Sequence, residues 1–127
     1  MLKDSKAFSS FSVDNSKKAK EFYEKTLGLE VSEESWGTLK LHLASENDVF
    51  VYPKEDHIPA TYTVLNFSVE DIEKMADELS AKGVQFEHYD QGMLKTNAKG
   101  ISEGPGRKMA WFKDPAGNFM ALLEEEK

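Results

Sequence analysis

The pattern of apolar and polar residues predicts that the first half of the chain folds as a strand, a helix and three further strands. Residues 7–13 alternate as in a half-buried strand. A helical stripe of apolar residues then runs from Ala19 to Leu27. It stops at Gly28, which suits the left-handed residue that follows a helix. Shorter strands are predicted at residues 29–32, 38–43 and 49–52.

The second half repeats this order after a polar, proline-containing linker at residues 54–60. A strand is predicted over 62–69, and residues 68–71 have the spacing of a capping box, with Asp71 as the reciprocal acid. The next helical stripe begins at Ile72, and Gly83 is expected to end that helix. The half is completed by a strand at 84–87, a long glycine-rich connection at 91–106 and two closing strands at 109–112 and 119–123.

A turn at residues 114–118 is predicted to join the two closing strands. Asp114, Pro115 and Gly117 stand at the first, second and fourth places that a type I turn favours. The Asp114 carboxylate is placed to accept the backbone N–H of Ala116, two residues on. The turn would therefore fix the register of both strands and decide which side chains share a face.

Because the two halves share one plan, we expect a duplicated unit and an α+β fold. Val13 and Val69 take equivalent places, as do Gly28 and Gly83. The expected architecture is two tandem βαβββ modules that form a curved mixed sheet, since one helix and one sheet bury little apolar surface alone. The chain would be one domain, residues 1–127, with modules at 7–53 and 61–123.

Period-two alternation divides the strands into a face covered by the helices and a face that lines a trough between the modules. The mixture of apolar and polar groups on the second face suits a ligand pocket; the alternatives are a second packed layer or an oligomer interface. The predicted helix-side residues are Phe11, Val13, Leu39, Leu41, Leu43, Phe50, Tyr52, Leu65, Phe67, Phe112, Met120 and Leu122. The predicted trough residues are Phe8, Ser10, Ser12, Thr38, Lys40, His42, Val49, Val51, Val64, Asn66, Arg107, Met109, Trp111, Phe119 and Ala121.

Composition narrows the classes of partner. The net charge is −7, which disfavours nucleic acid and favours a cationic small molecule. No apolar run approaches the roughly 20 residues of a membrane span. The absence of Cys excludes disulfides, thiolate catalysis and Cys-based zinc sites. The first residues lack the apolar core of a signal peptide, so a cytoplasmic protein is expected.

Several stretches of the chain resemble the vicinal oxygen chelate superfamily of glyoxalase I, extradiol dioxygenases, and fosfomycin- and bleomycin-resistance proteins. The resemblance spans about residues 7–123 and includes a helix-end pattern and the Asp-Pro-x-Gly-Asn turn. It implies the doubled βαβββ fold but not a particular reaction. The matching segments are 13–15, 21–23, 27–30, 67–71 and 112–118.

The resemblance also implies where a metal would bind, because enzymes of this superfamily hold a divalent ion with His and Glu side chains from four strands. The corresponding positions here hold Phe8, Val51, Val64 and Ala121. None of these side chains has a lone pair for a metal. We therefore expect no metal at the family site and no cofactor; relocated ligands remain an alternative.

The candidate chemistry centres on His42, which shares the predicted trough face with Lys40. A partly exposed strand histidine is the alternative interpretation. His57 is expected to be solvated, and His88 to face solvent or a loop. No Ser-His-Asp or paired-carboxylate constellation can be read from the spacing. The predicted ligand-binding residues are Trp36, Lys40, His42, Asn66, Glu103, Arg107, Met109, Trp111 and Phe119.

Two functions follow from these residues. The first is a metal-free protein, similar to the bleomycin-resistance branch, that binds a small organic molecule of cationic or amphipathic character in the trough. The second is a metal-independent enzyme of the lyase or isomerase type, which uses His42 and the loop charges Glu103 and Arg107. A homodimer is implied by the family resemblance. Membranes and nucleic acids are not expected partners.

Overall fold

The protein was analysed as a computed structural model that describes residues 1–45 and 47–126. The chain forms two compact units, Met1–Ile58 and a second that begins at Pro59. The division falls within residues 54–60, where the sequence is polar and contains Pro59.

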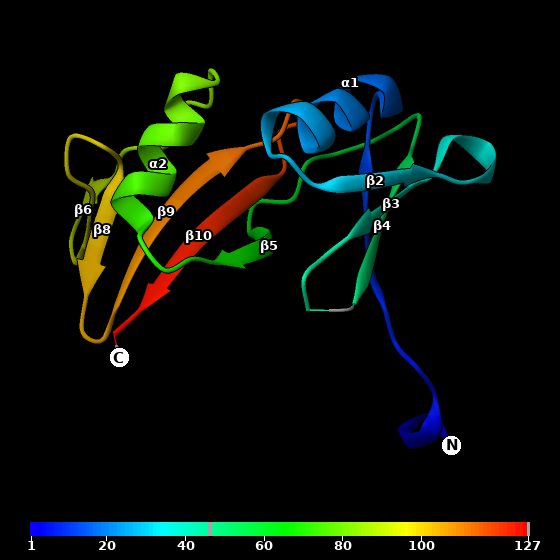
Figure 1. Cartoon of the computed structure of the whole chain (residues 1–127), viewed down its shortest axis with the longest axis horizontal. Coiled ribbons are helices and arrows are strands. Elements are labelled where there is room, and N and C mark those ends of the chain that lie inside the picture. Colours follow the sequence, from blue (N-terminus) through cyan, green and yellow to red (C-terminus); the bar gives the residue numbers. More distant parts are fainter. Residues whose placement is uncertain (46, 127) are drawn as a thin grey trace. The chain divides into compact units, whose positions relative to one another are not determined.

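The first unit has a four-stranded sheet in the order β1-β4-β3-β2, with β1 parallel to β4 and the other pairs antiparallel (Figure 1). The helix α1 packs against β4. The elements in chain order are η1 (Leu2–Asp4), β1 (Ser9–Val13), α1 (Ser16–Glu21), the π-helical turn η2 (Phe22–Thr26), β2 (Glu30–Glu33), η3 (Ser35–Gly37), β3 (Leu39–His42) and β4 (Asp48–Pro53).

The second unit repeats this topology with the sheet order β5-β10-β9-β8, in which β5 is parallel to β10. The helix α2 packs against β9 and β10 (Figure 1). The predicted α+β fold with two βαβββ modules is therefore confirmed. The elements are β5 (Thr63–Ser68), α2 (Ile72–Ala81), β6 (Asp90–Gln91), β7 (Leu94–Lys95), β8 (Ile101–Gly104), β9 (Arg107–Lys113) and β10 (Phe119–Glu125).

Side-chain caps begin both helices. Asn15 accepts a hydrogen bond from the Lys18 backbone N–H at 3.1 Å, and Asp71 accepts one from Lys74 at the same distance. The predicted capping box, with Ser68 as the cap, is wrong because Asp71 itself is the N-cap residue. Glu124 on β10 instead accepts the Ile72 N–H at 2.9 Å, which ties the helix start to the sheet.

The predicted orientation of β4 is wrong by one residue. Val49 and Val51 are buried, whereas Phe50 is half-buried and Tyr52 is 37% exposed. The register places Val51 beside Phe11 and Leu39, which lie on the buried face. Val49 and Val51 therefore belong to the helix side, and Phe50 and Tyr52 to the opposite face. Four consecutive apolar residues give no alternation that would fix the orientation of the strand.

The edge-strand position of the second unit, which corresponds to β2 in the first, is divided between two segments. Residues 84–87 form no strand, but Phe86 makes a single bridge with Phe112. The same edge is continued by β8, which pairs with β9 through Ile101 and Ala110. The predicted connection at 91–106 thus contains β8 and the small β6–β7 hairpin. In this respect the second unit differs from the first, whose edge strand β2 is continuous.

The turn at Asp114 is confirmed and is held by a buried carboxylate. Asp114 is 4% exposed and accepts hydrogen bonds from the backbone N–H groups of Ala116 at 3.0 Å and Asn118 at 2.8 Å. The side-chain amide of Asn118, itself 2% exposed, donates to the second carboxylate oxygen at 3.0 Å. The turn starts the antiparallel pairing of Phe119 with Lys113.

Replacing the Asp114 carboxylate should destabilise the protein. Asp114→Ala would leave three donors without this acceptor, one of them a buried side-chain amide. We expect a loss of about 4 kcal/mol or more in the free energy of unfolding, because three hydrogen bonds to the carboxylate are lost and each contributes about 1.5–3 kcal/mol. Urea denaturation followed by circular dichroism measures this. The exposed Asp4→Ala should change stability by less than about 0.5 kcal/mol; equal effects of the two substitutions would contradict the role of the turn.

Candidate functional site

One face of the second sheet, opposite the buried Phe112 and Met120, carries a mixture of aromatic and polar side chains. Ala121 on the central strand β10 lies between Asn66 on β5 and Trp111 on β9. The next row contains Leu123 and Met109. The open face of the second unit is defined by Asn66, Met109, Trp111, Phe119, Ala121 and Leu123.

Two aromatic contacts shape this open face. The Trp111 and Tyr89 rings meet edge to face, with centroids 5.6 Å apart. Lys113 places its ammonium 5.0 Å from the centroid of the Phe119 ring. Burial raises the pKa of the Tyr89 hydroxyl, and the negative charge of Glu87 adds to the rise. Tyr89 therefore stays neutral at physiological pH, and its hydroxyl remains able to donate a hydrogen bond.

The first unit has a corresponding open face around Phe50. In register, Phe50 lies between Ser10 on β1 and Lys40 on β3. The Lys40 ammonium is 5.4 Å from the Phe50 ring centroid and forms an ion pair with Glu34 at 3.2 Å. The Phe8 ring, 68% exposed at that residue, contacts Phe50 with centroids 4.9 Å apart. Phe8 and Phe50 therefore form an apolar surface that is bordered by the charged side chains of Lys40 and Glu34.

His42 contacts a polar group at each ring nitrogen, through a hydrogen bond on one side and an ion-pair contact on the other, which spacing alone did not indicate. Its Nε2 lies 2.6 Å from the Ser32 hydroxyl oxygen, and its Nδ1 lies 3.3 Å from an Asp48 carboxylate oxygen. The three residues come from β2, β3 and β4. Spacing along the chain could not indicate this grouping, because strand pairing brings the three residues together.

The remaining predicted ligand residues lie away from these clusters. Trp36 is 93% exposed in η3, where its backbone has φ +64°, as expected for a turn. Glu103 and Arg107 flank the β8–β9 hairpin, and Glu103 lies 3.9 Å from the Lys108 ammonium. Arg107 is six residues from Lys113, about 20 Å along an extended strand. The hairpin charges and Phe119 therefore lie at opposite ends of the second sheet.

Three important residues were missed by sequence reasoning. Ser32 and Asp48 meet His42 only through strand pairing, which brings Glu30 and Asp48 opposite His42 and Lys40 opposite Ser32. Phe50 was assigned to the wrong face. One signal in the sequence could have located Ser32. Glu30 and Ser32 are the alternating polar residues of β2, so they share a face, and the register of the β2–β3 pair places this face beside His42.

The other two histidines differ from each other. His57 is half-buried and its Nδ1 lies 2.7 Å from the Ser12 hydroxyl oxygen, so the expectation of a solvated side chain is wrong. His88 is exposed, as expected.

The four family metal positions hold apolar side chains in the folded units. On β4, the residue on the open face is Phe50 rather than Val51, since Val51 is buried. Val64 lies at a register irregularity of β5, and Ala121 is buried. Among residues 1–45 and 47–126, no three His, Asp or Glu side chains gather as a metal site would require. No helix in this part of the chain is long and apolar enough to cross a membrane.

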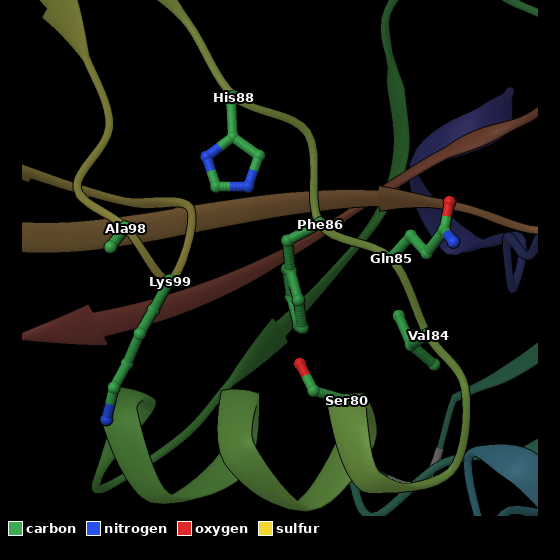
Figure 2. A pocket seen from close by; sticks show the side chains of 7 residues that line it. All are labelled: Ser80, Val84, Gln85, Phe86, His88, Ala98 and Lys99. Carbon is green, nitrogen blue, oxygen red and sulfur yellow. The ribbon is translucent and has the colours of Figure 1, made fainter.

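A separate cavity of about 340 Å³ lies beside the end of α2 (Figure 2). The Lys99 ammonium at its border is engaged by Asp77 at 3.0 Å, which raises the pKa of Lys99 through a hydrogen bond and charge attraction. The cavity contains none of the predicted ligand residues. Its lining consists of Ser80, Val84, Gln85, Phe86, His88, Ala98 and Lys99.

The doubled βαβββ unit and the Asp114 turn agree with a comparison of the sequence with models of protein families. Residues 9–122 match the Glyoxalase/Bleomycin resistance protein/Dioxygenase superfamily, and the chain belongs to this superfamily. No curated protein sequence matches the chain significantly.

Solved structures of low sequence identity share the fold. A superfamily member from Sphaerobacter thermophilus DSM 20745 is 23% identical, with a TM-score of 0.70 and coverage of 94% of this chain and 98% of that one. TnmS3, an antibiotic binding protein from Streptomyces sp. CB03234, is 21% identical, with a TM-score of 0.69 and coverage of 97% and 98%. The fosfomycin resistance protein FosX from Listeria monocytogenes is 12% identical, with a TM-score of 0.70 and coverage of 97% and 94%.

The two tryptophans should report different environments. Trp36→Phe leaves only the half-buried Trp111, and Trp111→Phe leaves only the 93% exposed Trp36. We expect the Trp36→Phe protein to emit at shorter wavelength and to be quenched several-fold less by acrylamide, because packing around Trp111 restricts access of the quencher. Emission spectra and quenching slopes of the two variants measure this. Equal quenching of both variants would contradict the described burial.

Proposed function

We propose that this protein is a metal-free small-molecule-binding member of its superfamily and that its ligand is an organic molecule of amphipathic or cationic character. The observation that carries the proposal is the open face of the second unit, where Trp111 and Met109 lie beside the polar Asn66. Ligand sites combine apolar surface with a few polar groups that fix orientation.

The side chains of this face suit a flat, partly apolar ligand. Trp111 offers a large ring for stacking, and its contact with Tyr89 limits its freedom. Ala121, beside it on the central strand, is buried, so a ligand would contact the half-buried Trp111 and Met109 instead. Met109 adapts to different ligand shapes. The net charge of −7 favours a cationic over an anionic molecule.

One similar solved structure, that of TnmS3, supports binding as the activity. TnmS3 is an antibiotic binding protein, and FosX is a fosfomycin resistance protein. At sequence identities of 21% and 12%, these structures share the fold with this chain but do not indicate its ligand. The character of the ligand follows from the residues of this chain.

The metal-free character is proposed from the side chains at the family metal positions. Phe8 and Phe50 are in ring contact, and Ala121 takes the place of a carboxylate. Aromatic and aliphatic carbons provide no ligand atom for a hard or borderline divalent cation. A bound molecule would instead meet apolar surface at these points.

Binding of a cationic aromatic probe should depend on Trp111. For acridine orange we expect Trp111→Ala to raise Kd about tenfold or more, equivalent to about 1.4 kcal/mol, because the stacking surface is lost. Isothermal titration calorimetry measures Kd. Trp36→Ala is the matched control and should leave Kd unchanged, as should prior dialysis against EDTA. Binding that survives Trp111→Ala would overturn the proposed surface, and binding lost to EDTA would overturn its metal-free character.

We also propose a homodimer, in keeping with the family resemblance. Light scattering should then give a species of twice the chain mass of 14.3 kDa. A concentration-independent species of 14.3 kDa would contradict this proposal and leave the binding proposal intact.

A further inference from the structure

Three side chains on adjacent strands of the first unit form a continuous chain of polar contacts. The Ser32 hydroxyl oxygen on β2 is 2.6 Å from His42 Nε2 on β3, and His42 Nδ1 is 3.3 Å from an Asp48 oxygen on β4. A hydroxyl nucleophile, an imidazole base and an orienting carboxylate in this order are the parts of a serine hydrolase triad, which is recognised by geometry rather than by sequence order.

We propose that Ser32, His42 and Asp48 form an acyl-transfer site that hydrolyses esters with small aromatic or aliphatic acyl groups. This activity goes beyond the proposed binding function, and it involves different residues from Trp111 and Met109. It requires no metal, because the hydroxyl is activated by an adjacent base.

The groups that face the two ring nitrogens favour the tautomer of His42 that such a site needs. An ionised Asp48 carboxylate only accepts hydrogen bonds, so the facing Nδ1 of a neutral imidazole carries the proton. The lone pair of Nε2 then faces Ser32, whose hydroxyl donates to it. Ser32 is therefore the nucleophile, His42 is the catalytic base, and Asp48 is a positioning residue that fixes the ring.

The site is open to substrate. The side chains of His42 and Asp48 are 33% and 39% exposed, and Ser32 is half-buried. Ser32 lies on β2, the last strand in the sheet order β1-β4-β3-β2. A substrate thus has access to the hydroxyl from the open face of the sheet.

Neighbouring residues on this face match the needs of an ester. Lys40 lies directly opposite Ser32 and can place its positive charge near the oxyanion that forms on the carbonyl oxygen. Phe50 neighbours Lys40 in register, two strands from Ser32, and its ring contacts Phe8, so an apolar acyl group has a surface on the far side of Lys40 from the nucleophile. The carboxylates of Glu34 and Glu30 border this area and disfavour anionic esters.

The reaction balances without a co-reactant other than water. Ser32 Oγ attacks the ester carbonyl carbon while its proton passes to His42 Nε2. The carbon–oxygen bond to the leaving group then breaks, and His42 returns this proton to the departing alkoxide. Water attacks the resulting acyl-serine with His42 again as base, and the acid is released with Ser32 regenerated. Asp48 remains ionised throughout and stabilises the imidazolium.

A covalent serine probe tests the proposal directly. We expect a fluorophosphonate reagent to modify the full chain at Ser32, as identified by intact mass and peptide mapping, and phenyl acetate to be hydrolysed by the same protein. Ser32→Ala should abolish both. His42→Gln should slow labelling about 100-fold or more, the usual size of a general-base contribution. Ser35→Ala is the matched control: it removes an exposed hydroxyl nearby and should change neither rate.

The role of Asp48 needs a readout that a purely structural role would not change. Asp48→Asn should slow labelling at least about tenfold, while Asp48→Glu, which keeps a carboxylate, should restore part of the rate. Circular dichroism establishes that each variant is folded. Labelling absent from the folded wild-type chain, labelling of another residue, or unchanged rates in folded His42→Gln would each overturn the proposal. Acridine orange binding, measured on the same samples, separates this result from the fate of the binding function.

Discussion

The buried carboxylate of Asp114 determines how the last two strands are aligned, and much of the second unit depends on that alignment. Its hydrogen bonds to Ala116 and Asn118 fix the turn from which β9 and β10 pair. The pairing then sets Trp111 beside Ala121 and directs Phe112 and Met120 toward the covered side of the sheet. A single buried carboxyl group thus decides which side chains of the last two strands share a face.

The sequence was sufficient to predict the elements that depend on local patterns. The helices follow apolar stripes with capping residues at one end and a left-handed glycine at the other, as Gly28 with φ +74° and Gly83 with φ +97° demonstrate. The order of the strands and the helix along the chain in each unit agreed with the internal repeat. These features rest on residues close together in the chain, where side-chain preference and backbone geometry act directly.

The errors arose where neighbouring strands decide the outcome. Val49 to Tyr52 are all apolar, so their orientation is set by pairing with Phe11 and Leu39 and not by alternation. The Ser32–His42–Asp48 contacts also require the register of three strands. Candidate residues on one strand face, such as Met109 and Trp111, were placed together correctly, whereas Arg107 lies at the far end of the same strand. Spacing along the chain identifies the shared face but not the neighbours across it.

The interrupted edge strand of the second unit has a consequence for self-association. A continuous edge exposes a row of backbone donors and acceptors onto which another chain can add. In the second unit this edge passes from β8 to the Phe86 bridge, with residues 88–100 leaving the sheet between them. An incoming strand would find the row of backbone donors and acceptors interrupted there. On the continuous edge of the first unit, the charged Glu30 and Glu33 of β2 oppose such addition by a different means. The two halves of this duplicated fold thus use separate forms of protection against aggregation.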